Sequence, residues 1–239
     1  MELGLAGKSV LVTGGTKGIG LACVKVFAAE GCRVHVAARN RDALEGVDAT
    51  FHGVDLRDGK ALHELAARCA DVDILVNNAG DIPGGTLESV DEAKWRHAWE
   101  LKVFAYIDLS RELFAQMKAR GSGVIVNVIG MAAEKPSFEY ICGATANAGL
   151  AAFTKALGKG SIDHGVRVVG VHQPSTRTER ILAVMKAAAK AKLGDENRYE
   201  ELGDIFGGLI EPGQVADMVA FIASRRAGRL SGVVLSLGS

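Results

Sequence analysis

Residues 13–20 read Thr13-Gly-Gly-Thr-Lys-Gly-Ile-Gly20. They follow an apolar run at 8–13 that is typical of a buried strand, and they open a helical pattern over 18–30. Glycines in this context permit a tight turn, let the backbone approach a pyrophosphate, and let helix and strand pack closely. The free N–H groups of the helix N-terminus then favour phosphate. The stretch therefore predicts a dinucleotide site, with contacts from Gly14, Thr16, Lys17, Gly18, Ile19 and Gly20.

The rest of the chain alternates apolar runs with helical stretches. Strands are predicted at 33–38, 50–54, 73–77, 123–129, 166–172 and 233–237, and helices at 60–69, 91–120, 143–159 and 215–223. Strands this apolar are buried on both faces, which favours a parallel sheet between helices. We expect one α/β domain over 1–239: a Rossmann-type, doubly wound parallel sheet of about seven strands in a three-layer α/β/α arrangement. The polar insertion at 175–212, with a short helix around 186–192, is expected to act as a substrate-side lid.

Composition narrows the class of protein. The 239 residues carry a formal net charge of zero, so no basic excess attracts nucleic acid or an anionic membrane. Neither a leader peptide nor a membrane span is expected. The four cysteines are scattered, and Cys32 and His35 have no second ligand pair beside them. We therefore expect a cytoplasmic protein with no metal site.

The residue after the second predicted strand indicates which dinucleotide binds. An NAD site usually has an acidic residue there, which accepts hydrogen bonds from the ribose 2′-hydroxyl. Here the strand ends in Ala37-Ala38-Arg39. A guanidinium attracts a 2′-phosphate, and Lys17 can add a second positive charge. The sequence predicts NADP in preference to NAD; the alternative is that both cations are simply solvated.

Several further motifs, in this order, resemble the short-chain dehydrogenase/reductase family along essentially the whole chain. They are the TGxxxGxG loop at 13–20, Val54-Asp55-Leu56, Asn77-Asn-Ala-Gly80, Gly123-Val-Ile-Val-Asn127 and Glu211-Pro-Gly-Gln-Val-Ala216. The resemblance implies that the cofactor also contacts Asp55, Leu56, Asn78, Ala79 and Gly80.

The resemblance fails at the catalytic positions. In the family, a serine and a tyrosine hold the substrate carbonyl, and a lysine four residues after the tyrosine lowers its pKa. Here Gly130 stands at the serine, Gly143 at the tyrosine and Asn147 at the lysine. Lys102 stands at a structural asparagine. Turnover by the family's usual proton transfer is therefore expected to be weak or absent.

Other groups are candidates to replace the missing ones. Tyr140 precedes the tyrosine position by three residues, and Lys102, pointing inward, can lower the pKa of Tyr140 or hold the ribose. The alternatives are a cleft-wall aromatic and a solvated lysine. Asn147 can still bond a ribose hydroxyl, and Thr178 keeps the family's threonine after the sixth strand. Cys142 and His172 are further titratable groups near strand ends, but a filler and a strand cap are the simpler interpretations.

Three functions remain open. The first, favoured by the resemblance, is an oxidoreductase with an atypical active site that acts on a small carbonyl or alcohol. The second is a catalytically inactive NADP(H)-binding scaffold or regulator, and the third is a non-redox epimerase or lyase. The substrate is not predicted. A homodimer or homotetramer is expected from small residues at 143–159 and from apolar residues on the preceding helix: Phe104, Tyr106, Leu109, Leu113 and Phe114.

Overall fold

A computed structural model describes residues 2–41, 44, 46–206 and 208–238. Its centre is a seven-stranded sheet in the order β3-β2-β1-β4-β5-β6-β7, with every neighbouring pair parallel. The strands are β1 (Ser9–Thr13), β2 (Arg33–Ala38), β3 (Thr50–Gly53), β4 (Ile74–Asn77), β5 (Gly123–Gly130), β6 (Val166–Gln173) and β7 (Val233–Ser236). The predicted Rossmann-type α/β fold is confirmed.

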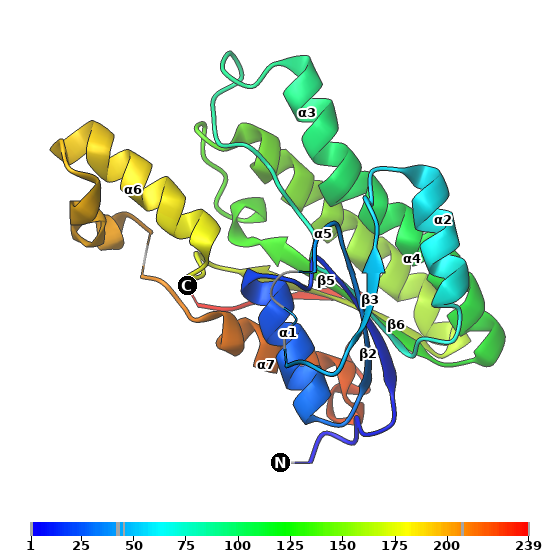
Figure 1. The fold of residues 1–239 in the computed structure, drawn as a ribbon. Coiled ribbons are helices and arrows are strands. Elements are labelled where there is room, and N and C mark those ends of the chain that lie inside the picture. Colours follow the sequence, from blue (N-terminus) through cyan, green and yellow to red (C-terminus); the bar gives the residue numbers. More distant parts are fainter. Residues whose placement is uncertain (1, 42–43, 45, 207, 239) are drawn as a thin grey trace.

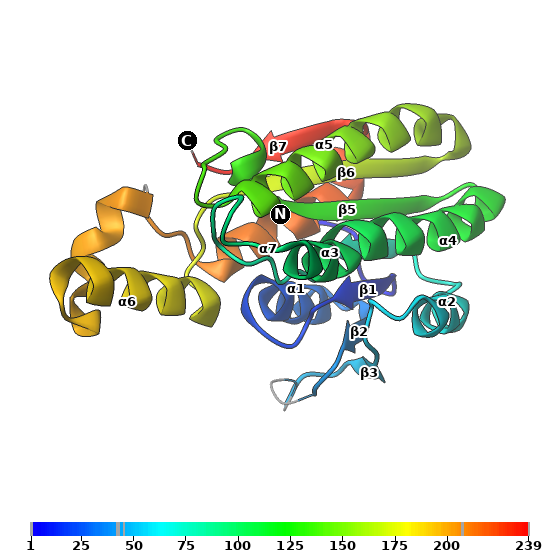
Figure 2. The ribbon, with the colours of Figure 1, turned by 90° about the horizontal axis from the view of Figure 1, so that it is seen from above.

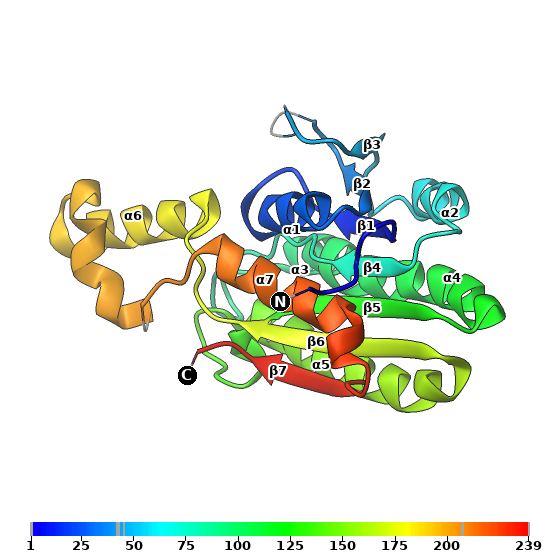
Figure 3. The same ribbon diagram turned by 90° about the horizontal axis from the view of Figure 1, so that it is seen from below.

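Helices cover both faces of the sheet, as Figures 1, 2 and 3 show. The alternation of strand side chains sets this arrangement, because Val10 and Val12 pack in one apolar cluster while Leu11 packs in the other. The first face carries α1 (Gly18–Ala29) and α7 (Pro212–Ala223). The opposite face carries α2 (Gly59–Arg68), α4 (Ala105–Arg120) and α5 (Ile141–Ser161). Within the described residues, no helix combines the length and the apolar character that a membrane span requires.

The predicted helix over 91–120 is interrupted. It consists of α3 (Glu92–Trp99), a π-helical turn (Glu100–Phe104) and α4. Such turns widen the helix locally and often occur at functional sites. The π-helical turn contains Lys102, which lies near the carboxyl ends of β4 and β5.

The insertion forms a separate arm. Its stem pairs Thr176 with Ile210, and Arg177 donates its backbone N–H to the Ile210 carbonyl at 2.8 Å. Beyond the stem lie α6 (Glu179–Leu193), longer than the helix predicted at 186–192, and a 3-10 stretch (Glu196–Phe206). The arm projects past the carboxyl ends of the strands (Figures 1 and 3). It begins beside the expected cofactor site.

Part of the surface expected to join subunits belongs to the protein's own core. Tyr106, Leu109 and Leu113 are buried within the single chain, so they leave no apolar face for a partner. Phe104 stays exposed, as do the small residues Ala148 and Gly149 of α5. The homo-oligomer remains a prediction that rests on this smaller surface.

Candidate active site

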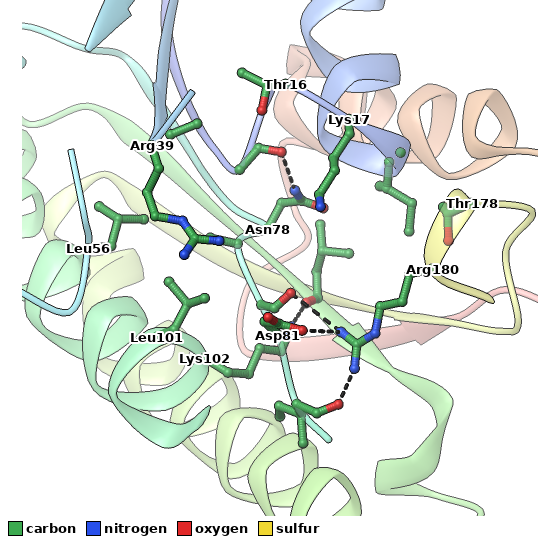
Figure 4. A pocket seen from close by; sticks show the side chains of 18 of the residues that line it. Thr16, Lys17, Arg39, Leu56, Asn78, Asp81, Leu101, Lys102, Thr178 and Arg180 are labelled. Atoms are coloured by element: carbon green, nitrogen blue, oxygen red, sulfur yellow. Dashed lines mark hydrogen bonds and ion pairs between the residues drawn. The ribbon is translucent and has the colours of Figure 1, made fainter. Parts of the chain in front are cut away.

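A cleft of about 790 Å³ opens at the carboxyl ends of the strands. Its walls come from the β1–α1 turn, the ends of β2, β4 and β5, the segment after β3, α5 and the base of the arm. Figure 4 shows the cations Lys17, Arg39, Lys102 and Arg180 around it. Ligands bind at this edge in open α/β sheets, and the volume suits a cofactor.

The glycine turn is shaped to receive a phosphate. Gly14 has φ +65°, and a Cβ at Gly20 would lie only 2.1 Å from the Gly14 carbonyl oxygen. Asn78 fixes the turn, since its side-chain amide donates to the carbonyls of Thr13 (3.0 Å) and Gly14 (3.3 Å). Lys17 makes no side-chain capping bond to α1, so among the described residues the helix lacks the usual N-cap acceptor. The geometry fits a dinucleotide pyrophosphate.

Three cations besides Lys102 and Arg180 line the cleft. They are Lys17 in the glycine turn, Arg39 after β2, and Arg57, which was not among the residues predicted from the sequence. Arg57 holds the Asp55 carboxylate with two hydrogen bonds, from Nε (2.9 Å) and Nη2 (2.7 Å), and thereby lowers the pKa of that carboxyl. Asp55 is therefore ionised in this wall, beside the buried Leu56. The signal for Arg57 in the sequence is its position two residues after Asp55.

Buried amides hold the strands beneath the cleft. Asn77 donates to Ser110 Oγ (3.0 Å) and to Asn127 Oδ1 (2.9 Å), and Asn127 donates to Thr154 Oγ1 (2.9 Å). This hydrogen-bond network joins β4, β5, α4 and α5 through fully buried side chains. It fixes the relative positions of the turn at 77–80 and the end of β5.

Neighbouring side chains fill the space beside Gly143 and Gly130, the glycines expected at the tyrosine and serine positions. A Cβ at Gly143 would lie 2.1 Å from Tyr140 Cζ, so the Tyr140 ring fills the space above this glycine. Asn147 accepts the Gly130 N–H with Oδ1 at 3.1 Å, and its Nδ2 would be 2.9 Å from a Cβ at Gly130. Asn147 lines the cleft, but its carbonyl oxygen holds β5 rather than a ribose. Tyr140 and Asn147 thus occupy the space that a side chain at Gly143 or Gly130 would take.

Lys102 is buried in the wall of the cleft. Its Nζ donates to the Val128 carbonyl (2.8 Å) and to Tyr106 Oη (2.9 Å), and its stem packs over Gly80. The inward-pointing Lys102 is therefore found, and its alternative, a solvated lysine, is wrong. Burial, with a smaller contribution from the charge of Arg180, lowers the pKa of Lys102 from 10.5 to about 7. Its amine can therefore both give and take a proton near neutral pH.

Arg180, rather than Lys102, is the cation beside Tyr140. Burial raises the pKa of Tyr140, and the Arg180 guanidinium partly opposes that shift. Arg180 begins the arm and crosses to the loop after β4, where it donates to the Ile82 carbonyl and approaches Asp81 Oδ1 at 3.9 Å (Figure 4). The expectation that Lys102 activates Tyr140 is therefore corrected. Tyr140 remains a neutral phenol that closes one side of the cleft.

The remaining candidates have structural partners. Thr178 caps α6 through its hydroxyl, and its methyl group would lie 3.0 Å from a Cβ at Gly18, so the arm meets the glycine turn here. Cys142 is buried, which raises the pKa of its thiol. His172 places Nδ1 2.9 Å from a Glu134 oxygen. Neither Cys142 nor His172 lines the cleft.

Comparison with known proteins identifies the family. A profile described as short chain dehydrogenase matches residues 8–188, which include the glycine turn, the 77–80 turn and most of the cleft wall. The chain belongs to this family. Its relatives include the 2,3-dihydro-2,3-dihydroxybenzoate dehydrogenase of Bacillus subtilis, 28% identical over 95% of this chain and 93% of the relative. The L-xylulose reductase of Mus musculus is 28% identical over 98% of this chain and 96% of the relative.

A solved structure shows the same fold with a ligand. The L-sorbose reductase of Gluconobacter frateurii, complexed with NADPH and L-sorbose, superposes with a TM-score of 0.91 at 28% identity. The match covers all of this chain and 97% of the reductase. This chain is thus a member of an oxidoreductase family with NADPH-bound structural neighbours.

Proposed function

We propose that this protein is an NADP(H)-dependent oxidoreductase for a small carbonyl or alcohol, and that Lys102 transfers the proton. The observation that carries the proposal is the buried Lys102 ammonium in the cleft wall, with a pKa of about 7. An acid or base works best when its pKa lies near the working pH. Gly130, Gly143 and Asn147 offer no such group.

The preference for NADP rests on charge. Lys17, in the glycine turn, and Arg39, after β2, both line the cleft, and neither has an ion pair in the part of the chain that the structure describes. Cations that are free of ion pairs there favour a 2′-phosphate, to which a guanidinium can bind with two hydrogen bonds. The NADPH complex of L-sorbose reductase supports this assignment.

The proton transfer follows from the surroundings of Lys102. When bound, the nicotinamide supplies the hydride for reduction and accepts it in oxidation. Lys102 Nζ uses two hydrogens on Val128 and Tyr106, which leaves a third for a substrate oxygen. In reduction the ammonium gives this proton to the carbonyl oxygen, and the neutral amine regains one from water. In oxidation the neutral amine takes the proton of the alcohol.

The substrate class is a small polar carbonyl compound or the corresponding alcohol. Arg180, Asp81 and Asn147 provide polar groups around Lys102, while Ile82 and Val128 provide apolar ones. This mixture suits a compact hydroxylated molecule. The substrates named for L-sorbose reductase and L-xylulose reductase belong to that class.

The test is a panel of small hydroxyketones, including L-sorbose and L-xylulose, with NADPH absorbance as the signal. We expect turnover in the parent and a loss of about 10²–10⁴-fold in Lys102→Met. NADPH affinity, measured by fluorescence titration, should remain. The control is Lys118→Met, which removes an exposed lysine of α4 and should leave both quantities unchanged.

Two outcomes would replace the proposal. Tight NADPH binding without turnover on any substrate would favour the cofactor-binding scaffold or regulator. Turnover that survives in Lys102→Met but is lost in Tyr140→Phe would assign the proton transfer to the phenol.

A further inference from the structure

Three side chains of metal-binding types meet near the β3 edge of the sheet, on the face that carries α2. They are His35 on β2, His52 on the edge strand β3, and Cys69 at the C-terminus of α2. Their ligand atoms all lie within 4.8 Å of one another. No metal site was expected from the sequence, because the cysteines are scattered and no second ligand pair accompanies Cys32 and His35. His35, His52 and Cys69 are each 17 positions from the next, so no short motif marks them.

Two of the three distances in the cluster lie close to the edges of a metal tetrahedron, and the third pair of ligand atoms, from His35 and Cys69, lies within 4.8 Å. His35 Nδ1 lies 3.1 Å from His52 Nε2, and that nitrogen lies 3.7 Å from Cys69 Sγ. A tetrahedral zinc ion with Zn–N bonds of about 2.0–2.1 Å and a Zn–S bond of about 2.3 Å separates two nitrogens by about 3.3 Å. The same ion separates nitrogen from sulfur by about 3.6 Å. One ion can therefore contact all three atoms after small side-chain shifts.

The central nitrogen of this cluster, His52 Nε2, is shared between two neighbours. Nε2 of a neutral imidazole carries either one hydrogen or one lone pair, so it makes one good hydrogen bond. Here it faces both a second imidazole nitrogen and a thiol. A cation at the centre would accept lone pairs from all three groups at once.

Both histidines offer a ring nitrogen to the centre of the cluster, and Cys69 would bind as a thiolate. Burial raises the pKa of the Cys69 thiol to about 11, so a metal must displace its proton, as metals commonly do. Arg68 favours the thiolate and Asp71 opposes it.

We propose that His35, His52 and Cys69 bind one zinc ion, with water in the fourth position. Two imidazoles and one thiolate form a borderline-soft donor set that suits Zn²⁺. The ligands sit on elements fixed by the sheet ladder, since His52 is paired in register with Ala37. His35 and His52 are partly exposed, so they leave a route for the ion. The ion would link β2, β3 and the C-terminus of α2. Because Ala37 of β2 also lines the cofactor cleft, this link would lie close to Arg39.

Calorimetric titration of the untagged full chain with ZnCl₂ tests the site. We expect one ion per chain, a rise in Tm with zinc, and a weakening of at least ~10–100-fold in Cys69→Ser, the effect that loss of even an outer-shell partner has. The controls are Cys32→Ser and His63→Gln, a partly exposed thiol and an exposed imidazole outside the cluster. Both should bind zinc as the parent does.

Cobalt provides a readout on the parent protein, which covers the case in which Cys69→Ser fails to fold. Bound Co²⁺ should give a thiolate charge-transfer band and intense tetrahedral visible bands, both absent after prior loading with zinc. Their absence in the parent, or equal zinc affinity in parent and folded Cys69→Ser, would overturn the site and leave a hydrogen-bonded cluster. Because neither readout involves NADPH or turnover, failure here is separate from failure of the proposed function.

Discussion

Replacement of Lys102 by methionine should change how the stability of the protein depends on pH. The buried ammonium is disfavoured in the folded state, where its pKa is about 7, against 10.5 for an ordinary lysine. Below pH 7 both states carry the proton, and the folded state bears the full cost of burying the charge. As the pH rises from 7 to 10.5 the folded state is neutral while the unfolded state is still charged, so the parent gains stability.

The magnitude follows from these two values. Each pKa unit corresponds to about 1.4 kcal/mol, so linkage gives the parent roughly 2–3 kcal/mol relative to Lys102→Met between about pH 6 and pH 9. The two hydrogen bonds of Nζ, to Val128 and Tyr106, contribute to the difference in unfolding free energy between parent and Lys102→Met at any one pH. The change in this free-energy difference with pH reports the titration of Lys102 alone.

The assay is urea unfolding of parent and Lys102→Met at unit pH intervals, with Lys118→Met as the exposed control. We expect the difference between parent and Lys102→Met to move in favour of the parent as pH rises. A difference that stays constant from pH 6 to pH 9 would show that Lys102 is not buried as a titrating amine, and would refute the reasoning.

Three further predictions concern the cleft and the assembly. Arg39→Asp should weaken NADPH by roughly 10–100-fold, the loss of a charge-assisted hydrogen bond, while leaving NADH affinity equal or higher; unchanged NADPH affinity in a fluorescence titration would contradict this. Arg180→Ala removes a cation that repels the Lys102 ammonium, so NMR titration of the Lys102 ε-methylene signals should give a higher pKa than in the parent. Light scattering at micromolar concentration should give a dimer or tetramer, and a monomer-sized particle would rule out the expected contact through α5 and Phe104.

The fold was predictable because its signals are local. Apolar strands buried on both faces, a glycine turn and amphipathic helices each occupy a short window of sequence. The element boundaries differ from the predictions by a few residues, except that α6 begins seven residues before the helix expected around 186–192. The π-helical turn at Glu100–Phe104 was not predicted, since nothing in the periodicity of 91–120 marks it.

The candidate site was less predictable because it depends on distant contacts. Lys102 and Tyr140 were candidates from the sequence alone. The sequence does not show that Arg180 is the cation beside Tyr140, or that Lys102 bonds the Val128 carbonyl instead. Likewise, the sequence shows only that Gly143 has no side chain. The structure shows that the Tyr140 ring fills the space beside it. The His35, His52 and Cys69 cluster exists only when β2, β3 and α2 are brought together.

The pH dependence of hydride transfer tests the assignment of Lys102 most directly. With a substrate from the panel, single-turnover reduction by NADPH should slow as the pH rises through about 7, because Lys102 loses the proton it gives. Oxidation of the product alcohol by NADP⁺ should accelerate through the same pH, because the neutral amine is the base. Both limbs should disappear in Lys102→Met. A limb near pH 10, typical of a phenol, or a limb near 7 that persists in Lys102→Met would contradict the account.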